Sequence, residues 1–207
     1  MLNNLQRIWL VNLDTNSDSN RPIEVQRFYY FRPGDATIYF FLNLDHRSWE
    51  EAMKMSLREL ADFKGEGILK VEKGTKPADF LRTSYANDLI VSDRVIEILY
   101  RYQVRSFSTY KVKIFHGDME LKGYYGLAIT GRGGPNDKNN IEHYIGSLHK
   151  NRMTRIKGIR PTAWDGSDLF TCDDLWRVAL ATERVKAIFE KEKVTNCQFR
   201  PAENFQA

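Results

Sequence analysis

The chain has few cysteines and no long apolar segment, and each shortage excludes a class of protein. Its 207 residues include only Cys172 and Cys197, which are too few for a disulfide scaffold or a four-thiolate zinc site. No apolar run approaches the ~20 residues that cross a bilayer. Met1–Leu13 lacks both the apolar core and the cleavage site of a signal peptide. We therefore expect a reduced, cytoplasmic protein that does not enter a membrane.

Basic residues exceed acidic ones by four, and the excess is local. Residues 104–207 hold 17 basic and 12 acidic side chains, and Lys150–Arg160 contains five basic residues and no acid. An acidic stretch follows at once, with Asp165, Asp168, Asp173 and Asp174. Such a dipolar pattern is less typical of a nucleic-acid groove than one-sided charge. For the basic run we favour a solvated face or a protein contact over nucleic acid.

The composition indicates a folded globular protein. Hydrophobic residues make up 42% of the chain and aromatic residues 13%, too many for a disordered chain. A chain of this length buries roughly 70% of its unfolded surface. We expect a single domain, 1–207, with the alternative of an N-terminal lobe, 1–76, packed on a C-terminal lobe, 77–207.

The N-terminal third predicts strands and one helix. Arg7–Leu13 is expected to be a strand, and the aromatic runs 27–31 and 37–42 flank Arg-Pro-Gly-Asp, which predicts a β-hairpin with a type II turn. Both runs are apolar on both faces, which is typical of central strands. The capping-box spacing Ser48–Glu51 then predicts a helix over Trp49–Phe63, and a strand over Ile68–Glu72 follows.

A near-repeat links two later segments at an offset of 90 residues. Residues 89–99 align with 179–189, and each copy has a hydroxyl residue, Ser92 or Thr182, at a predicted helix N-cap. Apolar residues three and four apart follow, and each copy leads into a predicted strand, 106–115 or 196–200. The repeat is either an old duplication or two independent uses of the same helix-start chemistry.

The remaining signals complete the predicted fold class. His116-Gly117-Asp118 marks a second hairpin between 110–115 and 119–130, residues 131–140 read as a flexible loop, 141–149 as a short helix and Arg155–Ile159 as a strand. The frequent hairpins exclude a regular βαβ winding. We predict an α+β fold with a mixed, mostly antiparallel sheet of seven or eight strands and three to four helices.

Motifs for catalysis are weak throughout. Gly131–Gly134 lacks the spacing of a phosphate-binding loop, and His143 and His149 are six residues apart and so lie on different sides of a helix. Cys172 has no identifiable histidine partner. The acidic stretch 165–174 could supply the acid and base of a small hydrolase. We assign no catalytic, cofactor-binding or metal-binding residue and expect no cofactor.

The tail carries a family resemblance. Asp168-Leu169-Phe170, then Thr182-Glu183-Arg184-Val185-Lys186, then Gln198-Phe199-Arg200-Pro201 resemble the ending of a family of bacterial immunity proteins from polymorphic toxin systems. Residues 77–81, 89–92 and 123–125 are similar to its middle section. The resemblance implies a non-enzymatic cytoplasmic protein that binds and neutralises a cognate toxin encoded nearby.

The contact residues do not follow from the family, because such surfaces vary with the toxin. We take candidates from the loop, the basic run and the start of the acidic stretch: Arg132, Asp137, Arg152, Arg155, Arg160, Trp164 and Asp165. The alternatives are a protein that binds or processes nucleic acid, motivated by the basic run, and a hydrolase that uses the acidic stretch.

Overall fold

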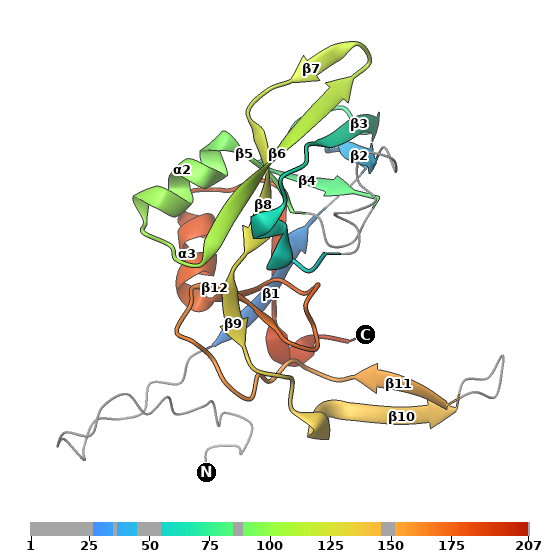
Figure 1. Ribbon diagram of the computed structural model, residues 1–207, viewed down its shortest axis with the longest axis vertical. Helices are drawn as coiled ribbons and strands as arrows, with labels where there is room; N and C mark the ends of the chain where they lie inside the picture. The colour runs from blue at the N-terminus through green and yellow to red at the C-terminus, as the bar shows by residue number, and fades with distance from the viewer. Residues whose placement is uncertain (1–26, 35–36, 45–54, 85–88, 146–151, 207) are drawn as a thin grey trace.

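The computed structural model describes residues 27–34, 37–44, 55–84, 89–145 and 152–206, and it contains two β-sheets and a separate β-hairpin (Figure 1). The side chains of Leu44 and of residues 140–155 are not described. The predicted strand Arg7–Leu13 and the capping box Ser48–Glu51 lie outside the described residues.

The first sheet has seven strands in the order β3-β2-β4-β5-β8-β6-β7. Their bounds are β2 Phe41–Leu44, β3 Gly67–Lys73, β4 Phe80–Thr83, β5 Ile90–Ser92, β6 Phe107–His116, β7 Met119–Leu121 and β8 Tyr124–Ile129. A parallel pairing of β3 with β6 closes six of these strands into a barrel. The hairpin of β6 and β7 extends beyond the barrel at the top of Figure 1.

The second sheet has five strands in the order β14-β1-β13-β12-β9. Their bounds are β1 Phe28–Pro33, β9 Gly131–Gly133, β12 Leu169–Cys172, β13 Leu180–Thr182 and β14 Cys197–Pro201. The separate hairpin consists of β10, Ile141–Ile145, and β11, Arg152–Ile156. Within the described chain, β10 and β11 pair only with each other.

The described residues contain two α-helices, α2 over Asp93–Arg101 and α3 over Glu183–Lys191. Short 3-10 helices occur at Glu59–Asp62 (η3), Lys138–Asn140 (η4) and Ala202–Asn204 (η5). The fold is mixed α+β but richer in strands than predicted, and the expectation of three to four helices is wrong for this part of the chain. Residues 55–63, expected to be helical, form only η3. In the turn before it the Glu59 amide donates to Ser56 Oγ at 3.1 Å, and the Ser56 amide donates to the Glu59 carboxylate at 2.6 Å.

The two predicted helices and the strands after them are confirmed. Each helix buries an apolar face of three residues, Val95, Ile98 and Leu99 on α2 and Val185, Ile188 and Phe189 on α3. Both faces belong to one continuous core. Fully burying one such side chain contributes about 1.5 to 3 kcal/mol, so the helices are held mainly by packing against the sheets.

The near-repeat in the sequence is a repeat in the structure. The first unit consists of β4, β5, α2, β6 and β8, and the second unit consists of β12, β13, α3, β14 and β1. In the first unit β8 lies between β5 and β6, and in the second unit β1 lies between β13 and β14. The registers match: Ser92 pairs with Tyr124 as Thr182 pairs with Phe28, and Phe107 pairs with Ile129 as Cys197 pairs with Pro33. The middle strand follows its helix in the first unit and precedes it in the second.

The turns after the helices repeat as well. Gln103 and Ser106 have φ values of 51° and 74°, and Lys193 and Asn196, at the equivalent positions, have 52° and 56°. Asn196 occupies a positive-φ position that glycine commonly fills, and asparagine tolerates this conformation better than most residues. Two shared left-handed positions and a shared register are difficult to reach independently, so the structure favours duplication over two separate uses of helix-start chemistry.

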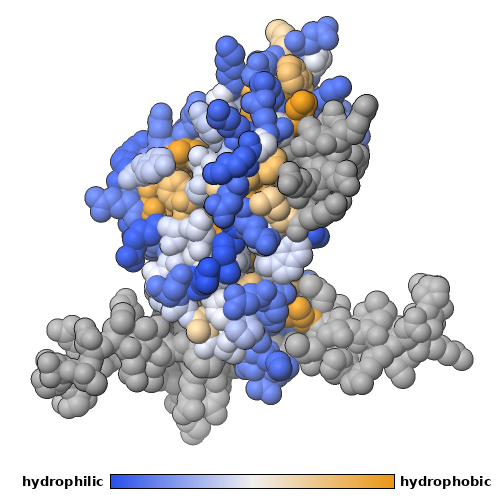
Figure 2. Space-filling model, viewed as in Figure 1, coloured by the Kyte–Doolittle hydropathy of each residue, from blue (hydrophilic) through white to orange (hydrophobic). Residues whose placement is uncertain are grey.

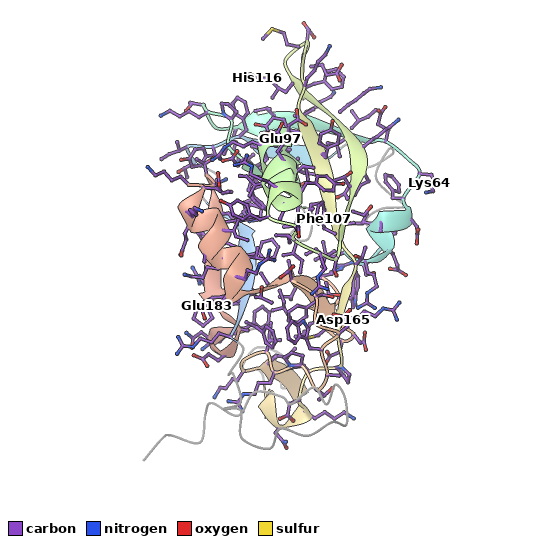
Figure 3. The ribbon with its side chains drawn as sticks, turned by 90° about the vertical axis from the view of Figure 1, so that its left-hand side faces the viewer. Lys64, Glu97, Phe107, His116, Asp165 and Glu183 are labelled. Atoms are coloured by element: carbon purple, nitrogen blue, oxygen red, sulfur yellow. The ribbon has the colours of Figure 1, made fainter. Side chains whose placement is uncertain are left out.

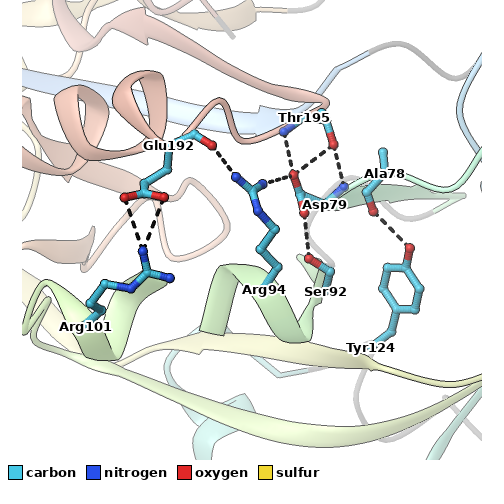
Figure 4. A network of polar contacts seen from close by, with 8 residues as sticks. All are labelled: Ala78, Asp79, Ser92, Arg94, Arg101, Tyr124, Glu192 and Thr195. Atoms are coloured by element: carbon cyan, nitrogen blue, oxygen red, sulfur yellow. Dashed lines mark hydrogen bonds and ion pairs between the residues drawn. The ribbon is translucent and has the colours of Figure 1, made fainter. Parts of the chain in front are cut away.

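Each unit holds the other by an aspartate–arginine pair. Asp79 precedes β4, and its carboxylate accepts hydrogen bonds from Arg94 of α2 at 2.7 Å and from the Thr195 amide at 2.8 Å (Figure 4). Arg94 also donates to the carbonyl of Glu192, at the end of α3. The pair in the first unit therefore binds the turn that ends the helix of the second.

The second unit repeats this contact in the opposite direction. Asp168 precedes β12 and accepts from Arg184 of α3 at 2.9 Å and from the Arg105 amide at 3.0 Å. Arg184 also donates to the carbonyl of Tyr102, at the end of α2. We call these two contacts the reciprocal clasps. Asp79 and Asp168 are each 8% exposed, so water competes little for either carboxylate.

The predicted capping by Ser92 and Thr182 is half right. Both residues occupy the N-cap position with extended backbone, but neither side chain bonds to the first turn of its helix. Ser92 Oγ instead donates to Asp79 Oδ1 at 2.8 Å. The buried hydroxyl of Thr182 has no hydrogen-bond partner.

The predicted hairpin between 27–31 and 37–42 is wrong. β1 and β2 lie in different sheets, and the chain crosses from one sheet to the other between them. Gly34 is not at positive φ; its amide donates to the carbonyl of Asn196 at 2.9 Å. The expectation of central strands is confirmed, because β1 pairs on both sides and buries Tyr29 and Phe31.

Residues 131–145 also differ from their prediction. The expected flexible loop begins as β9, which pairs in parallel with β12, and the expected helix over 141–149 begins as β10. A Cβ on Gly131 would lie 2.2 Å from the Leu169 carbonyl oxygen, so glycine here permits close strand packing rather than phosphate binding. The strand predicted over Arg155–Ile159 is β11, which ends at Ile156. The second predicted hairpin is confirmed, with Gly117 at φ 61° in its turn.

The clasps predict a large effect from one buried carboxylate. Asp79→Ala should lower the free energy of unfolding by about 2 to 3 kcal/mol, because the Thr195 amide and Arg94 lose their acceptor. Asp118→Ala, in the exposed turn between β6 and β7, should change it by less than about 0.5 kcal/mol. Urea unfolding followed by tryptophan fluorescence measures both. Equal midpoints for the two variants would show that the clasp contributes nothing to stability.

The two N-cap positions should respond differently to loss of the hydroxyl. Ser92→Ala should cost about 1 kcal/mol, because its hydrogen bond to Asp79 is lost. Thr182→Val should be neutral or stabilising, because it removes a buried hydroxyl without a partner and keeps the shape of the side chain. Thermal unfolding of both variants checks the contrast. A loss of stability in Thr182→Val equal to that in Ser92→Ala would instead indicate a capping role.

Candidate partner-binding site

The structure brings the backbones of all seven candidate residues to one end of the molecule. Arg132 lies on β9, Arg152 and Arg155 lie on β11, and the other four lie in the two segments that join this hairpin to the sheet, 134–140 and 157–168. These segments run side by side: the Asp137 amide donates to the Arg160 carbonyl at 2.8 Å, and Gly133 pairs with Trp164. We call this region the hairpin end (Figure 1, bottom).

Trp164 forms part of the foundation of the hairpin end. Its ring packs edge-on against Phe28 at 5.2 Å and lies 6.2 Å from Phe170, within a small second core. Its indole N–H donates to the Ser167 carbonyl at 3.0 Å. The half-buried ring therefore anchors segment 157–168 to the second sheet.

The two acidic candidates shape turns. Asp165 accepts from the Arg132 amide at 2.8 Å and from the Ser167 amide at 3.0 Å. Asp137 accepts from the Asn139 amide at 2.9 Å. Both carboxylates thus fix local backbone and partly offset the positive charge around them.

The exposed charges of this end are mainly basic. Arg132 and Arg160 are exposed, as are Lys138 and Lys157 beside them. Arg152 pairs with Ile145 and Arg155 with Glu142 in the register of the hairpin. The hairpin end thus presents an exposed basic surface, and at physiological salt such charges act over about 8 Å.

Asn136 fixes the base of the hairpin, and sequence reasoning missed it. Asn136 is 2% exposed. Its backbone amide donates to the Asp174 carboxylate at 2.8 Å. Its side-chain oxygen accepts from the Arg160 backbone amide at 2.6 Å, and its side-chain nitrogen donates to the Gly158 carbonyl at 3.4 Å. The polar stretch around it reads as a solvated loop, and only Pro135 before it indicated an ordered turn.

The carboxylates of the acidic stretch are dispersed. Asp168 belongs to a clasp, Asp173 lies 3.5 Å from Arg58, and Asp174 accepts from Asn136. With Asp165 bound to two amides, each of the four has a different structural partner. The geometry therefore gives no support to an acid and base facing one substrate.

A hollow of about 370 Å³ lies between η3 and the chain after β12. Its lining residues are Ser56, Arg58, Glu59, Thr171, Cys172, Asp173 and Trp176. Burial, with Asp174 and Asp173 nearby, raises the pKa of the Cys172 thiol to about 12. Burial also raises the pKa of Cys197. At neutral pH both are protonated, so neither is an activated nucleophile.

The described residues also lack a metal-binding cluster and a membrane-spanning helix. No group of three or more histidine, cysteine, aspartate or glutamate side chains in these parts could hold a metal ion. Neither α2 nor α3, the two α-helices described, has the length and apolarity to span a bilayer.

Asn136 predicts a local effect. Asn136→Ala should leave the Arg160 amide without its acceptor and lower the free energy of unfolding by about 1 to 3 kcal/mol. Amide hydrogen exchange should rise first in segments 134–140 and 157–160, at the hairpin end, and remain slow in α2 and α3. Asn139→Ala, exposed three residues later, is the matched control. Uniform exchange changes across the protein would contradict a local role.

Comparison with known proteins does not place this chain in a family. No protein-family model matches the chain, and no curated protein matches it.

Proposed function

We propose that this protein is a cytoplasmic immunity protein that binds a cognate toxin encoded nearby and blocks it without chemical turnover. The observation that supports this best is the hairpin end, an ordered base that carries an exposed basic surface and a two-stranded ribbon. A two-stranded ribbon has little stability of its own. Binding to a partner would cover it.

The resemblance of the tail supports the same proposal. Two of its residues, Asp168 and Arg184, form one reciprocal clasp, so this part of the motif serves the scaffold. A family that keeps its scaffold and changes its toxin needs a contact surface elsewhere. The seven candidate contact residues at the hairpin end lie outside the residues that carry the resemblance.

Charge suggests the nature of the toxin surface. Basic side chains at the hairpin end complement an acidic patch, which speeds association and selects partners. Inhibitory complexes commonly bury ~1,600 Å² in total, and nanomolar affinity corresponds to about −12 kcal/mol. Apolar contacts must supply much of this energy, because exposed ion pairs contribute about 1 kcal/mol or less each.

Co-expression with the product of the adjacent gene tests the proposal. We expect a stable complex on size-exclusion chromatography and restored growth of cells that make the toxin. A purified protein that hydrolyses a substrate, or that shifts labelled DNA or RNA at physiological salt, with no neighbouring product bound, would overturn the proposal.

The same complex tests the site. Arg152→Glu together with Arg155→Glu should lower the association rate at low salt, and the difference should shrink as ionic strength rises. Lys70→Glu together with Lys73→Glu, on β3 of the barrel, is the charge-matched control. An association rate that is unchanged in the first variant would place the contact away from β11.

A further inference from the structure

The outer surface beside α2 carries an apolar stripe. We call Ile96, Tyr100, Phe107 and Tyr125 the α2 stripe. Tyr100 is 67% exposed and Tyr125 38% exposed, and the rings of Tyr100 and Phe107 lie 5.2 Å apart. Figure 2 shows apolar surface among polar residues on the side where α2 lies, and Figure 3 shows Phe107 beside this helix, below Glu97.

The stripe follows the helix from end to end. Ile96 and Tyr100 are one turn apart on the same face of α2. Tyr125 lies on β8 next to the start of the helix, since the Asp93 amide donates to the Gly123 carbonyl at 2.8 Å. Phe107 begins β6, just after the turn that ends the helix.

The equivalent positions of the second unit show which residue types the fold accepts at the stripe. Ile96 and Tyr100 correspond to Lys186 and Glu190, which form an ion pair at 2.7 Å. Tyr125 corresponds to Tyr29, whose ring lies under Lys186 at 5.4 Å and is 9% exposed. In the second unit the lysine of an ion pair lies over the tyrosine, whose hydroxyl donates to Glu183 at 3.4 Å. In the first unit the tyrosine is exposed and an aromatic residue replaces the acid of the ion pair.

The fold therefore accepts charged residues at the positions of Ile96 and Tyr100, although Ile96 and Phe107 are half-buried against the core. Exposed tyrosine side chains beside half-buried apolar ones are typical of protein contacts, where a few aromatic residues supply most of the binding energy. The repeat strengthens the interpretation of the stripe as a contact surface, because the same backbone in the second unit carries charged residues at the equivalent positions.

The stripe adjoins the hairpin end. Arg105, two residues before Phe107, donates to the Gly166 carbonyl at 3.4 Å, and Ser106 Oγ donates to Ser167 Oγ at 2.9 Å. Gly166 and Ser167 directly follow Asp165, one of the candidate contact residues. The two surfaces thus meet at segment 165–167 and can be covered by one partner.

We propose that the α2 stripe is the apolar half of the toxin-binding surface, and this rests on the function proposed above. The exposed charges beside the stripe are of both signs: Arg105 and Lys111, the latter paired directly opposite Tyr125, and Asp93 and Glu97 on α2 itself. The occupant is therefore a folded protein whose contact surface has an apolar centre with charged residues of both signs around it, and whose acidic patch faces the adjoining basic hairpin end. The stripe provides affinity, and the basic hairpin end provides the association rate.

Placing the charged residue types of Lys186 and Glu190 at the equivalent positions of the first unit tests this proposal. Ile96→Lys together with Tyr100→Glu should leave the melting temperature of the free protein within a few degrees of wild type. The affinity for the toxin, measured by surface plasmon resonance, should fall at least tenfold, mainly through faster dissociation. Lys186→Ala together with Glu190→Ala, at the equivalent place in the second unit, should leave the affinity unchanged.

The outcomes separate the two proposals. A toxin that binds the wild type and the α2 variant equally well would overturn the stripe and leave the immunity function standing. An equal loss of affinity in the Lys186/Glu190 variant would also overturn the stripe, because the effect would not be specific to it. If wild type binds no neighbouring product, the function fails, and this use of the stripe fails with it.

Tyr125→Ser checks the result independently of α2. It removes an exposed ring without changing the helix, and we expect a loss of affinity in the same direction at an unchanged melting temperature. Unchanged affinity here would confine the contact to the helix and overturn a stripe that extends to β8.

Discussion

The two reciprocal clasps determine how the rest of this structure fits together. Each unites a carboxylate at the start of a strand, an arginine in the first turn of a helix and the backbone that ends the other helix. The carboxylates are buried and carry charge-assisted hydrogen bonds, which are stronger than neutral ones. Because each clasp begins in one unit and ends in the other, neither unit can shift without breaking both. The barrel and the open sheet are therefore positioned by a few polar atoms as much as by the shared apolar core.

This rigid pairing allows the surface to differ between the units. The residues that hold the scaffold are the buried aspartates, the two arginines and the apolar helix faces, and they occur in both. What differs lies outside them: a hairpin with an exposed basic base near the second sheet, and an apolar stripe along α2. Because the scaffold occurs twice, the two units can be compared position by position. A feature found in one unit and absent from the other is not required for folding.

Sequence patterns predicted what depends on neighbours along the chain. The two helices, the strand over 68–72 and the turn at Gly117 follow from spacing and turn residues within a few positions, and they are confirmed. The pairing of β1 with β13 and β14 could not be predicted, because strand partners far apart in sequence leave no local signal, and Arg-Pro-Gly-Asp favoured the wrong pairing. Asn136 and Asp79 were missed for a similar reason: their bonding partners are remote, and a buried polar residue has the same letter as a solvated one. The candidate residues at the hairpin end come from three neighbouring stretches of the sequence, and all but Trp164 are charged. The structure brings them together without testing their role.

The place of β1 has a consequence for the order in which the protein can be made. β1 is the first described strand to leave the ribosome, and its partners β13 and β14 are among the last. The first unit holds its strands and helix within one continuous stretch and can fold while synthesis proceeds. The second must wait, with the aromatic residues of β1 uncovered, until residue 201 has been added. A chain cut short before β14 would therefore retain a nearly complete barrel, and β1 would keep β13 as a partner but have its other edge unpaired. An open edge on a strongly apolar strand readily pairs with another chain. In this protein β14 completes the second sheet and thereby protects β1 from aggregation.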